Sequence, residues 1–269
     1  MRGARNLLGV VSLFVLIAST TTAARGEDFR IDTDVYVGSS KEPIAEVLTI
    51  FQAGRVWDFQ LTSPEEITLF EPQRGMLTLL DGKRKLRASL TTNELLNAAV
   101  DLQTAVTNQK NPNPIFLAAS KPLFEVTTEE IDENGSKFTR LNFAGKPIQY
   151  TVTALPAKHP AAATEYRYFS DWSARLSSLR PGNLPAGARL EVNDALAKKD
   201  LIPKEVHRVI HETSLVRAGL VPKKIEVRSQ HLVVWALSQE DLKRIDRAGD
   251  LLANSKLVSF EEFCGIGAP

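Results

Sequence analysis

Apolar and polar residues alternate in short runs over the segment from residue 29 to residue 90. A two-residue period places successive side chains on opposite faces of an extended chain, so each run predicts a half-buried strand. Short turn sequences such as Asp81-Gly82 separate the runs, whereas a crossover to a parallel strand needs about a dozen residues or more. The pattern therefore predicts an antiparallel meander of hairpins.

The last three runs of this meander lie between residues 66 and 91. Alternate residues of a strand lie on the same face of a sheet. We expect one face to be formed by Ile67, Leu69, Leu77, Leu79, Leu86, Ala88 and Leu90.

Helical spacing of apolar residues replaces the alternation in four segments. The first begins with a capping-box pattern, Thr91 followed by Glu94, and the fourth can be capped by Ser238 and Asp241. Because their apolar residues form one stripe, we expect these helices to pack on the sheet. The four segments lie at about residues 91–109, 160–180 and 187–199 and from residue 239 onward.

Strand patterns return after a segment rich in proline and asparagine at residues 108–114. Three runs follow between residues 123 and 155, and Asn134-Gly135 between the first two is a strong hairpin signal. Another run spans residues 224–238. No strand group looks large enough for independent stability, so we predict a single α+β domain. This domain spans residues 27–269, with an N-terminal meander at 28–90, a curved antiparallel sheet packed against about four helices, and an alternative internal boundary near 108–114.

The first 26 residues have the pattern of a signal peptide. Arg2 and Arg5 precede an apolar run of about 12 residues that ends at Ala18. A membrane-spanning helix needs roughly 20 such residues, so we expect cleavage before Glu27 rather than a permanent anchor. The mature protein is therefore expected to be periplasmic or extracellular, with no integral membrane segment.

Charge and cysteine content exclude two classes of protein. Removal of the leader lowers the number of basic residues from 33 to 30 against 32 acidic residues, which gives a formal net charge of −2. Nucleic-acid binding normally requires a basic surface, so no nucleic-acid partner is expected. The single cysteine, Cys264, excludes an internal disulfide framework.

The sequence "HRVIHETSL" contains two of the four histidines and raises the question of a metal site. A zincin helix needs His-Glu-x-x-His, but His211 and Glu212 are followed by Thr213, Ser214 and Leu215. His207 and His211 could share a metal only with a third ligand that the sequence does not identify. We therefore predict no metal ligand and keep a metal-dependent hydrolase based on His207, His211 and Glu212 as an alternative.

Other catalytic patterns are missing from the sequence. It contains neither a Gly-x-Ser-x-Gly elbow nor a phosphate-binding loop. Cys264 lies a few residues from the C-terminus, where fixed catalytic geometry is hard to maintain. The sequence thus favours a protein without catalytic residues or a cofactor.

Aromatic residues on the predicted strands and on the helix at 160–180 suggest a binding function. Such residues at regular spacing more often belong to a core, but a sheet flanked by helices can also enclose an apolar pocket. The candidates for lining a ligand site are Trp57, Phe59, Tyr166, Phe169 and Trp172.

We therefore predict a secreted or periplasmic, non-catalytic protein that binds an apolar small molecule or an envelope protein. The metal-dependent hydrolase remains one alternative. A structural subunit of a cell-envelope complex, with sheet edges paired to a partner, is the other.

Several segments carry a resemblance to known proteins. The leader, "DFRIDTDVYVG", "EPIAEVLTIFQAGRVWDF", "PEEITLFEPQRGMLTLLD" and "VSFEEF" together resemble an uncharacterised group of signal-peptide-bearing secreted bacterial proteins. That resemblance implies export but no activity. The strand-turn-strand pattern at residues 55–90 is similar to periplasmic carriers of the lipoprotein-carrier type, which implies a curved antiparallel half-barrel over helices. This chain differs by starting with strands where those carriers start with a helix.

Overall fold

The computed structural model describes residues 28–133, 135–216 and 219–266. The predicted signal peptide and Asn134 of the predicted Asn-Gly turn lie outside these residues. Within the described part of the chain, no helix combines the length and the apolar character needed to cross a membrane.

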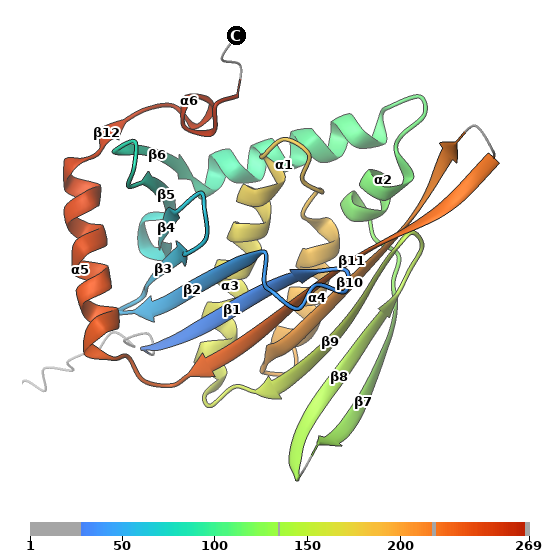
Figure 1. Cartoon of the computed structure of the whole chain (residues 1–269), viewed down its shortest axis with the longest axis horizontal. Helices are drawn as coiled ribbons and strands as arrows, with labels where there is room; N and C mark the ends of the chain where they lie inside the picture. The colour runs from blue at the N-terminus through green and yellow to red at the C-terminus, as the bar shows by residue number, and fades with distance from the viewer. Residues whose placement is uncertain (1–27, 134, 217–218, 267–269) are drawn as a thin grey trace, which may run out of the picture.

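The alternating segments form one sheet, which has twelve strands among the described residues (Figure 1). The strand order is β12-β6-β5-β4-β3-β2-β1-β11-β10-β9-β8-β7. The strands are β1 Phe29–Val37, β2 Ala45–Gln52, β3 Arg55–Gln60, β4 Glu66–Glu71, β5 Met76–Asp81, β6 Leu86–Thr91, β7 Glu125–Glu133, β8 Ser136–Ala144, β9 Ile148–Pro156, β10 Leu201–Val216, β11 Gly219–Val234 and β12 Lys256–Leu257.

Two meanders are joined through a pair of strands that are distant in sequence. β1 to β6 follow one another across one half of the sheet, and β7 to β11 follow one another across the other half. The halves meet where β1 pairs with β11 in antiparallel register, with Ile31 opposite Val233. Every pair is antiparallel except the short contact between β12 and β6. The prediction of a curved antiparallel sheet in an α+β fold is therefore confirmed.

Helices cover both faces of the sheet (Figure 1). We call the face that contacts α1 to α4 the inner face and the opposite face, on which α5 packs against β2 to β4, the outer face. The four predicted helices are observed, and two short ones, α2 and α6, were not predicted. The helices are α1 Thr92–Thr107, α2 Pro114–Ser120, α3 Pro160–Ser178, α4 Gly187–Ala197, α5 Gln239–Asn254 and α6 Phe260–Cys264.

The predicted helix caps are present. The Thr91 hydroxyl accepts a hydrogen bond from the backbone N–H of Glu94 at 3.1 Å, and the Glu94 carboxylate accepts one from the backbone N–H of Thr91 at 2.7 Å. Ser238 and Asp241 make the same reciprocal pair at the start of α5. These contacts satisfy backbone donors that would otherwise be left unpaired at the first turn.

Three apolar clusters hold the layers together. On the inner face, β1 to β6 pack against α3, where the rings of Phe29 and Phe51 stack with centroids 4.2 Å apart. A second inner cluster joins β8 to β10 with α2 and α4, and includes Val152 and Val192. The third lies on the outer face, where Ala248 of α5 covers residues of β2 to β4.

The prediction that Ile67 and Leu69 share a face with the named residues of β5 and β6 is wrong. Leu77 and Leu79 lie on the inner face, whereas Ile67 and Leu69 lie on the outer face beneath α5. The register explains the difference, because Phe70 is the residue opposite Leu77. Since both faces are covered by helices, residues of either parity can be apolar, and alternation alone does not identify the face.

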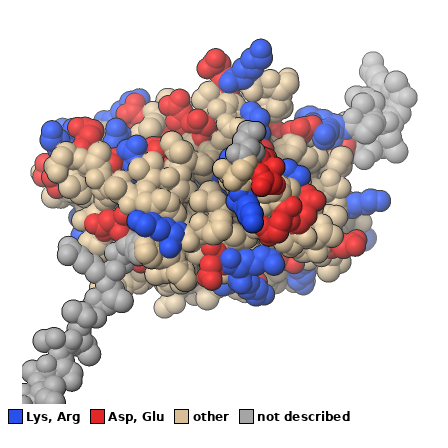
Figure 2. Space-filling view, turned by 90° about the horizontal axis from the view of Figure 1, so that it is seen from below, with Lys and Arg blue, Asp and Glu red and all other residues tan. Residues whose placement is uncertain are grey.

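Charged side chains of both signs occupy the surface. On the face shown in Figure 2, Lys and Arg are interspersed with Asp and Glu, so neither sign dominates this face.

Candidate ligand-binding cavity

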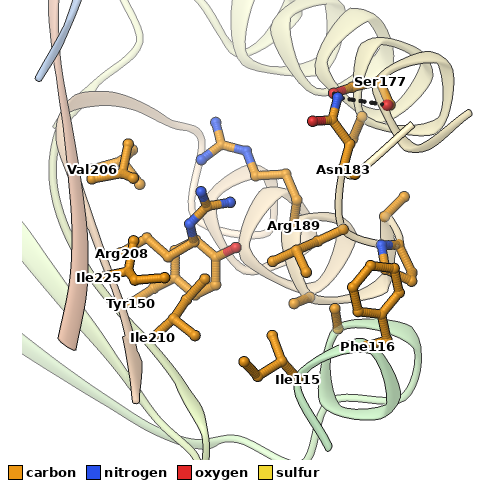
Figure 3. A pocket seen from close by; sticks show the side chains of 18 of the residues that line it. Ile115, Phe116, Tyr150, Ser177, Asn183, Arg189, Val206, Arg208, Ile210 and Ile225 are labelled. Carbon is orange, nitrogen blue, oxygen red and sulfur yellow. Dashed lines mark hydrogen bonds between the residues drawn. The ribbon is translucent and has the colours of Figure 1, made fainter. Parts of the chain in front are cut away.

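A cavity of about 670 Å³ lies between the inner face of the sheet and the helices α2 to α4. Its floor is formed by side chains of β1, β9, β10 and β11, and its walls come from the helices and from the loop that precedes α4. Figure 3 shows side chains from these elements converging on one space. The sheet that supplies the floor is the one in which β1 joins the two meanders.

The alternation of β10 determines which of its side chains reach the cavity. Val206, Arg208, Ile210 and Glu212 are two residues apart and all line it, as expected for one face of a strand. Arg208 lies opposite Tyr150 of β9 in the register, and Tyr150 also lines the cavity. Arg208 therefore stands between two apolar residues of this row, Val206 and Ile210.

A second guanidinium enters the cavity from the helical side. Arg189 lies in the first turn of α4 and donates a hydrogen bond to the Tyr166 hydroxyl of α3 at 3.3 Å. Arg208 makes no hydrogen bond or ion pair with the described residues. Both guanidinium groups project into the same space in Figure 3.

A smaller cavity of about 200 Å³ adjoins the first and shares Ala174, Ser177 and Arg189 with it. His231 lines this smaller cavity and bonds with the hydroxyl groups of Thr33 at 2.9 Å and Ser229 at 3.0 Å.

Burial, with a further contribution from Arg189, lowers the pKa of His231 to about 3. The imidazole is therefore neutral at neutral pH. Positive charge at this end of the cavity thus comes from Arg189 and Arg208.

The opposite end of the cavity is apolar. Ile115 of α2, Ile210 of β10 and Ile225 of β11 belong to the second inner cluster and line the cavity. In Figure 3, Ile115 and Phe116 lie away from the two guanidinium groups, whereas Ile210 lies next to Arg208 along β10. The cavity thus has a cationic part around Arg189 and Arg208 and a largely apolar part, beyond which Glu212 also lines it.

The five aromatic residues that the sequence suggested as ligand-lining lie on two different faces of the sheet. Tyr166 and Phe169 of α3 line the smaller cavity on the inner face. Trp172 packs beside them, with its ring 4.8 Å from the guanidinium carbon of Arg175.

The other two candidates, Trp57 and Phe59, lie on the outer face beneath α5, away from the inner cavities. The outer and inner residues therefore cannot contact one small molecule together. Neither residue lines the inner cavities, and the ligand-lining role of Trp57 and Phe59 stays a prediction.

The residues of the alternative metal site lie on different faces of β10. His207 is on the outer face, where its Nε2 is 3.3 Å from Oε2 of Glu226, whereas Glu212 lines the inner cavity. His211 follows His207 by four residues, which is about 13 Å along a strand. Among the described residues, no group of three or more His, Cys, Asp and Glu side chains is arranged to hold a metal ion.

Cys264 lies at the end of α6, next to the first inner cluster. Burial raises the pKa of its thiol above the usual value. This environment disfavours the thiolate form.

Sequence reasoning missed Arg189 and Arg208. For Arg208, the signal was present, because a charged residue stands between Val206 and Ile210 on the same side of an alternating run. For Arg189, no such signal exists, since a helix exposes cationic residues as a matter of course.

No protein-family model matches the sequence, and no curated protein matches it. The predicted resemblance to a group of secreted bacterial proteins therefore stays a prediction.

Among solved structures, the chain is similar to PNGF-II in two space groups. In the first, the TM-score is 0.38 with 8% sequence identity, over 89% of this chain and 33% of that chain. In the second, the TM-score is 0.33 with 8% identity, over 86% of this chain and 31% of that chain. This chain thus spans about a third of the length of PNGF-II.

The chain is also similar to a LolA superfamily protein, NE2245 from Nitrosomonas europaea, with a TM-score of 0.25 and 4% identity. The match covers 81% of this chain and 90% of that chain. At TM-scores this low, none of these likenesses assigns a family, a ligand or an activity.

Proposed function

We propose that this protein binds an apolar small molecule in the cavity between the inner face of the sheet and α2 to α4. The observation that carries the proposal is the cavity itself, whose volume of about 670 Å³ falls within the range of roughly 300–1,000 Å³ that is typical of small-molecule sites. Its apolar end, formed around Ile115, Ile210 and Ile225, offers a surface for a hydrocarbon group.

The proposal includes export and a non-catalytic role. The arginines and the short apolar run at the start of the chain support export to the periplasm or the exterior. Separation of His207 and Glu212 onto different faces of β10 argues against the hydrolase alternative.

The proposal can be tested with Nile red, a neutral apolar dye whose fluorescence rises in an apolar site. We expect the purified protein to bind about one equivalent of the dye. Ile225→Trp places a larger side chain in the apolar end and should weaken binding at least about tenfold, which corresponds to about 1.4 kcal/mol.

The matched control is Leu232→Trp, on the same strand but on the outer face, where Leu232 is 63% exposed. This variant should bind Nile red as the unmodified protein does. Absence of binding, or equal weakening by both variants, would refute the proposed function.

A further inference from the structure

The two arginines in the cavity differ from Arg30 and Arg180, which are paired with carboxylates. Arg30 forms an ion pair with Asp241 at 2.8 Å, and Arg180 forms one with Glu66. Neither Arg189 nor Arg208 has a carboxylate partner among the described residues. A partly buried cation without an anion is costly, because desolvation is not offset by pairing.

Glu212, an acid that lines the same cavity, is not paired with Arg189 or Arg208. Glu212 lies four residues after Arg208 on β10, about 13 Å along the strand. It stands beyond Ile210, toward the end of the strand that carries the apolar residues. An anion from outside the chain would therefore be drawn to the arginines and not to the far end.

The neighbours of the arginines can donate hydrogen bonds but add no charge. The hydroxyl of Ser229 lines the cavity beside Val206 in the register. The neutral ring of His231 and the Tyr166 hydroxyl lie next to it in the smaller cavity. Guanidinium groups bind carboxylates and phosphates through paired N–H donors, and hydroxyl groups can complete such a site.

We propose that the ligand is a single-chain amphiphile whose anionic head group is held between Arg189 and Arg208 and whose hydrocarbon chain lies toward Ile115, Ile210 and Ile225. This inference rests on the proposed function and specifies the chemistry of the ligand. It is supported by two guanidinium groups without carboxylate partners that face one cavity whose α2 side is lined by apolar residues (Figure 3).

The experiment is displacement of bound Nile red by molecules of equal chain length and different head group. Dodecanoate, dodecyl phosphate and dodecanol are compared below the concentrations at which they form micelles. At least one anionic compound should displace the dye at a concentration about tenfold or more below that required for dodecanol, or about 1.4 kcal/mol. Comparison of the two anions distinguishes a carboxylate head from a phosphate head.

Substitutions test whether the two arginines cause the preference for an anionic compound over dodecanol. Arg189→Gln and Arg208→Gln should each reduce the ratio between dodecanol and the preferred anion toward one, and Arg208→Lys should retain part of it, because the charge is kept. The matched control, Arg228→Gln, removes a cation on the adjacent strand that stacks over Tyr36 on the outer face. It should leave the ratio unchanged. Far-ultraviolet circular dichroism verifies that each variant is folded.

The outcomes separate this inference from the proposed function. Equal displacement by dodecanol and both anions, with Nile red bound normally, would refute the anionic head group and leave the apolar site intact. A preference that survives both Gln substitutions in folded protein would also refute it. Absence of Nile red binding by the unmodified protein would refute the proposed function and, with it, this inference.

Discussion

Ionisable groups on the inner face are affected by burial even outside the cavity. Asp58 of β3 accepts a hydrogen bond from the Thr49 hydroxyl at 2.6 Å. Burial is the main cause that raises its pKa from 3.8 to about 6, with the nearby Glu66 adding to the increase. The folded state therefore disfavours the carboxylate form of this residue, while the Thr49 hydrogen bond partly offsets the effect.

The raised pKa of Asp58 predicts that Asp58→Asn changes the free energy of unfolding in a pH-dependent way. The unfolded chain loses the Asp58 proton near 3.8 and the folded chain retains it to about 6, so the folded state of the unmodified protein is penalised progressively as the pH rises between these values. The amide carries no charge and can still accept from Thr49. We expect the variant to be more stable at pH 7 by roughly 1–3 kcal/mol, with the difference disappearing below pH 4.

Urea unfolding at the two pH values measures this difference. Asp246→Asn, on the exposed surface of α5, serves as the control and should show no such pH-dependent gain. Equal stability of Asp58→Asn and the unmodified protein at pH 7 would contradict the prediction.

At the scale of elements, α5 covers the outer face over β2 to β4. It shields Trp57, Phe59 and Leu69, and the carboxylate of Asp241 both caps the helix and accepts a hydrogen bond from Arg30 of β1 at 2.8 Å. The cap therefore anchors the helix to the sheet as well as completing its first turn.

Loss of the Ser238 hydroxyl should weaken this anchor. Ser238→Ala leaves the backbone N–H of Asp241 without its acceptor, and we expect a loss of about 1 kcal/mol in the free energy of unfolding. Ser238→Thr keeps a hydroxyl and should lose less than half as much. Urea unfolding measures both, and equal losses would show that the hydroxyl does not act as a cap.

At the scale of the molecule, the pairing of β1 with β11 makes one sheet from two meanders. We propose that the chain from residue 28 folds as a single domain, because neither half completes the sheet without the other. The cavity depends on this arrangement, since β1 and β11 both contribute to its floor.

A single domain predicts coincident unfolding of both halves. Variants that retain only Trp57, in the first meander, or only Trp235, immediately after β11, would report on each half by fluorescence, with the other tryptophans replaced by phenylalanine. We expect the two urea transitions to coincide, as two-state unfolding requires. Separate midpoints would instead support two units divided near residues 108–114.

The sequence determined the local elements of this protein. Period-two alternation and short turns specified the antiparallel strands, and Thr91 with Glu94 and Ser238 with Asp241 specified two helix starts. These features depend on residues within a few positions of one another, so they can be read along the chain.

Tertiary structure decided which face each residue joined and which residues met. Ile67 and Leu77 lie on opposite faces because the β4–β5 register is set by a turn at Pro72–Arg74, which Gly75 ends with a φ of 56°. Arg189 and Arg208 share a cavity because α4 packs over β10. Both outcomes follow from long-range packing and strand register, which the spacing of residues in the sequence does not encode.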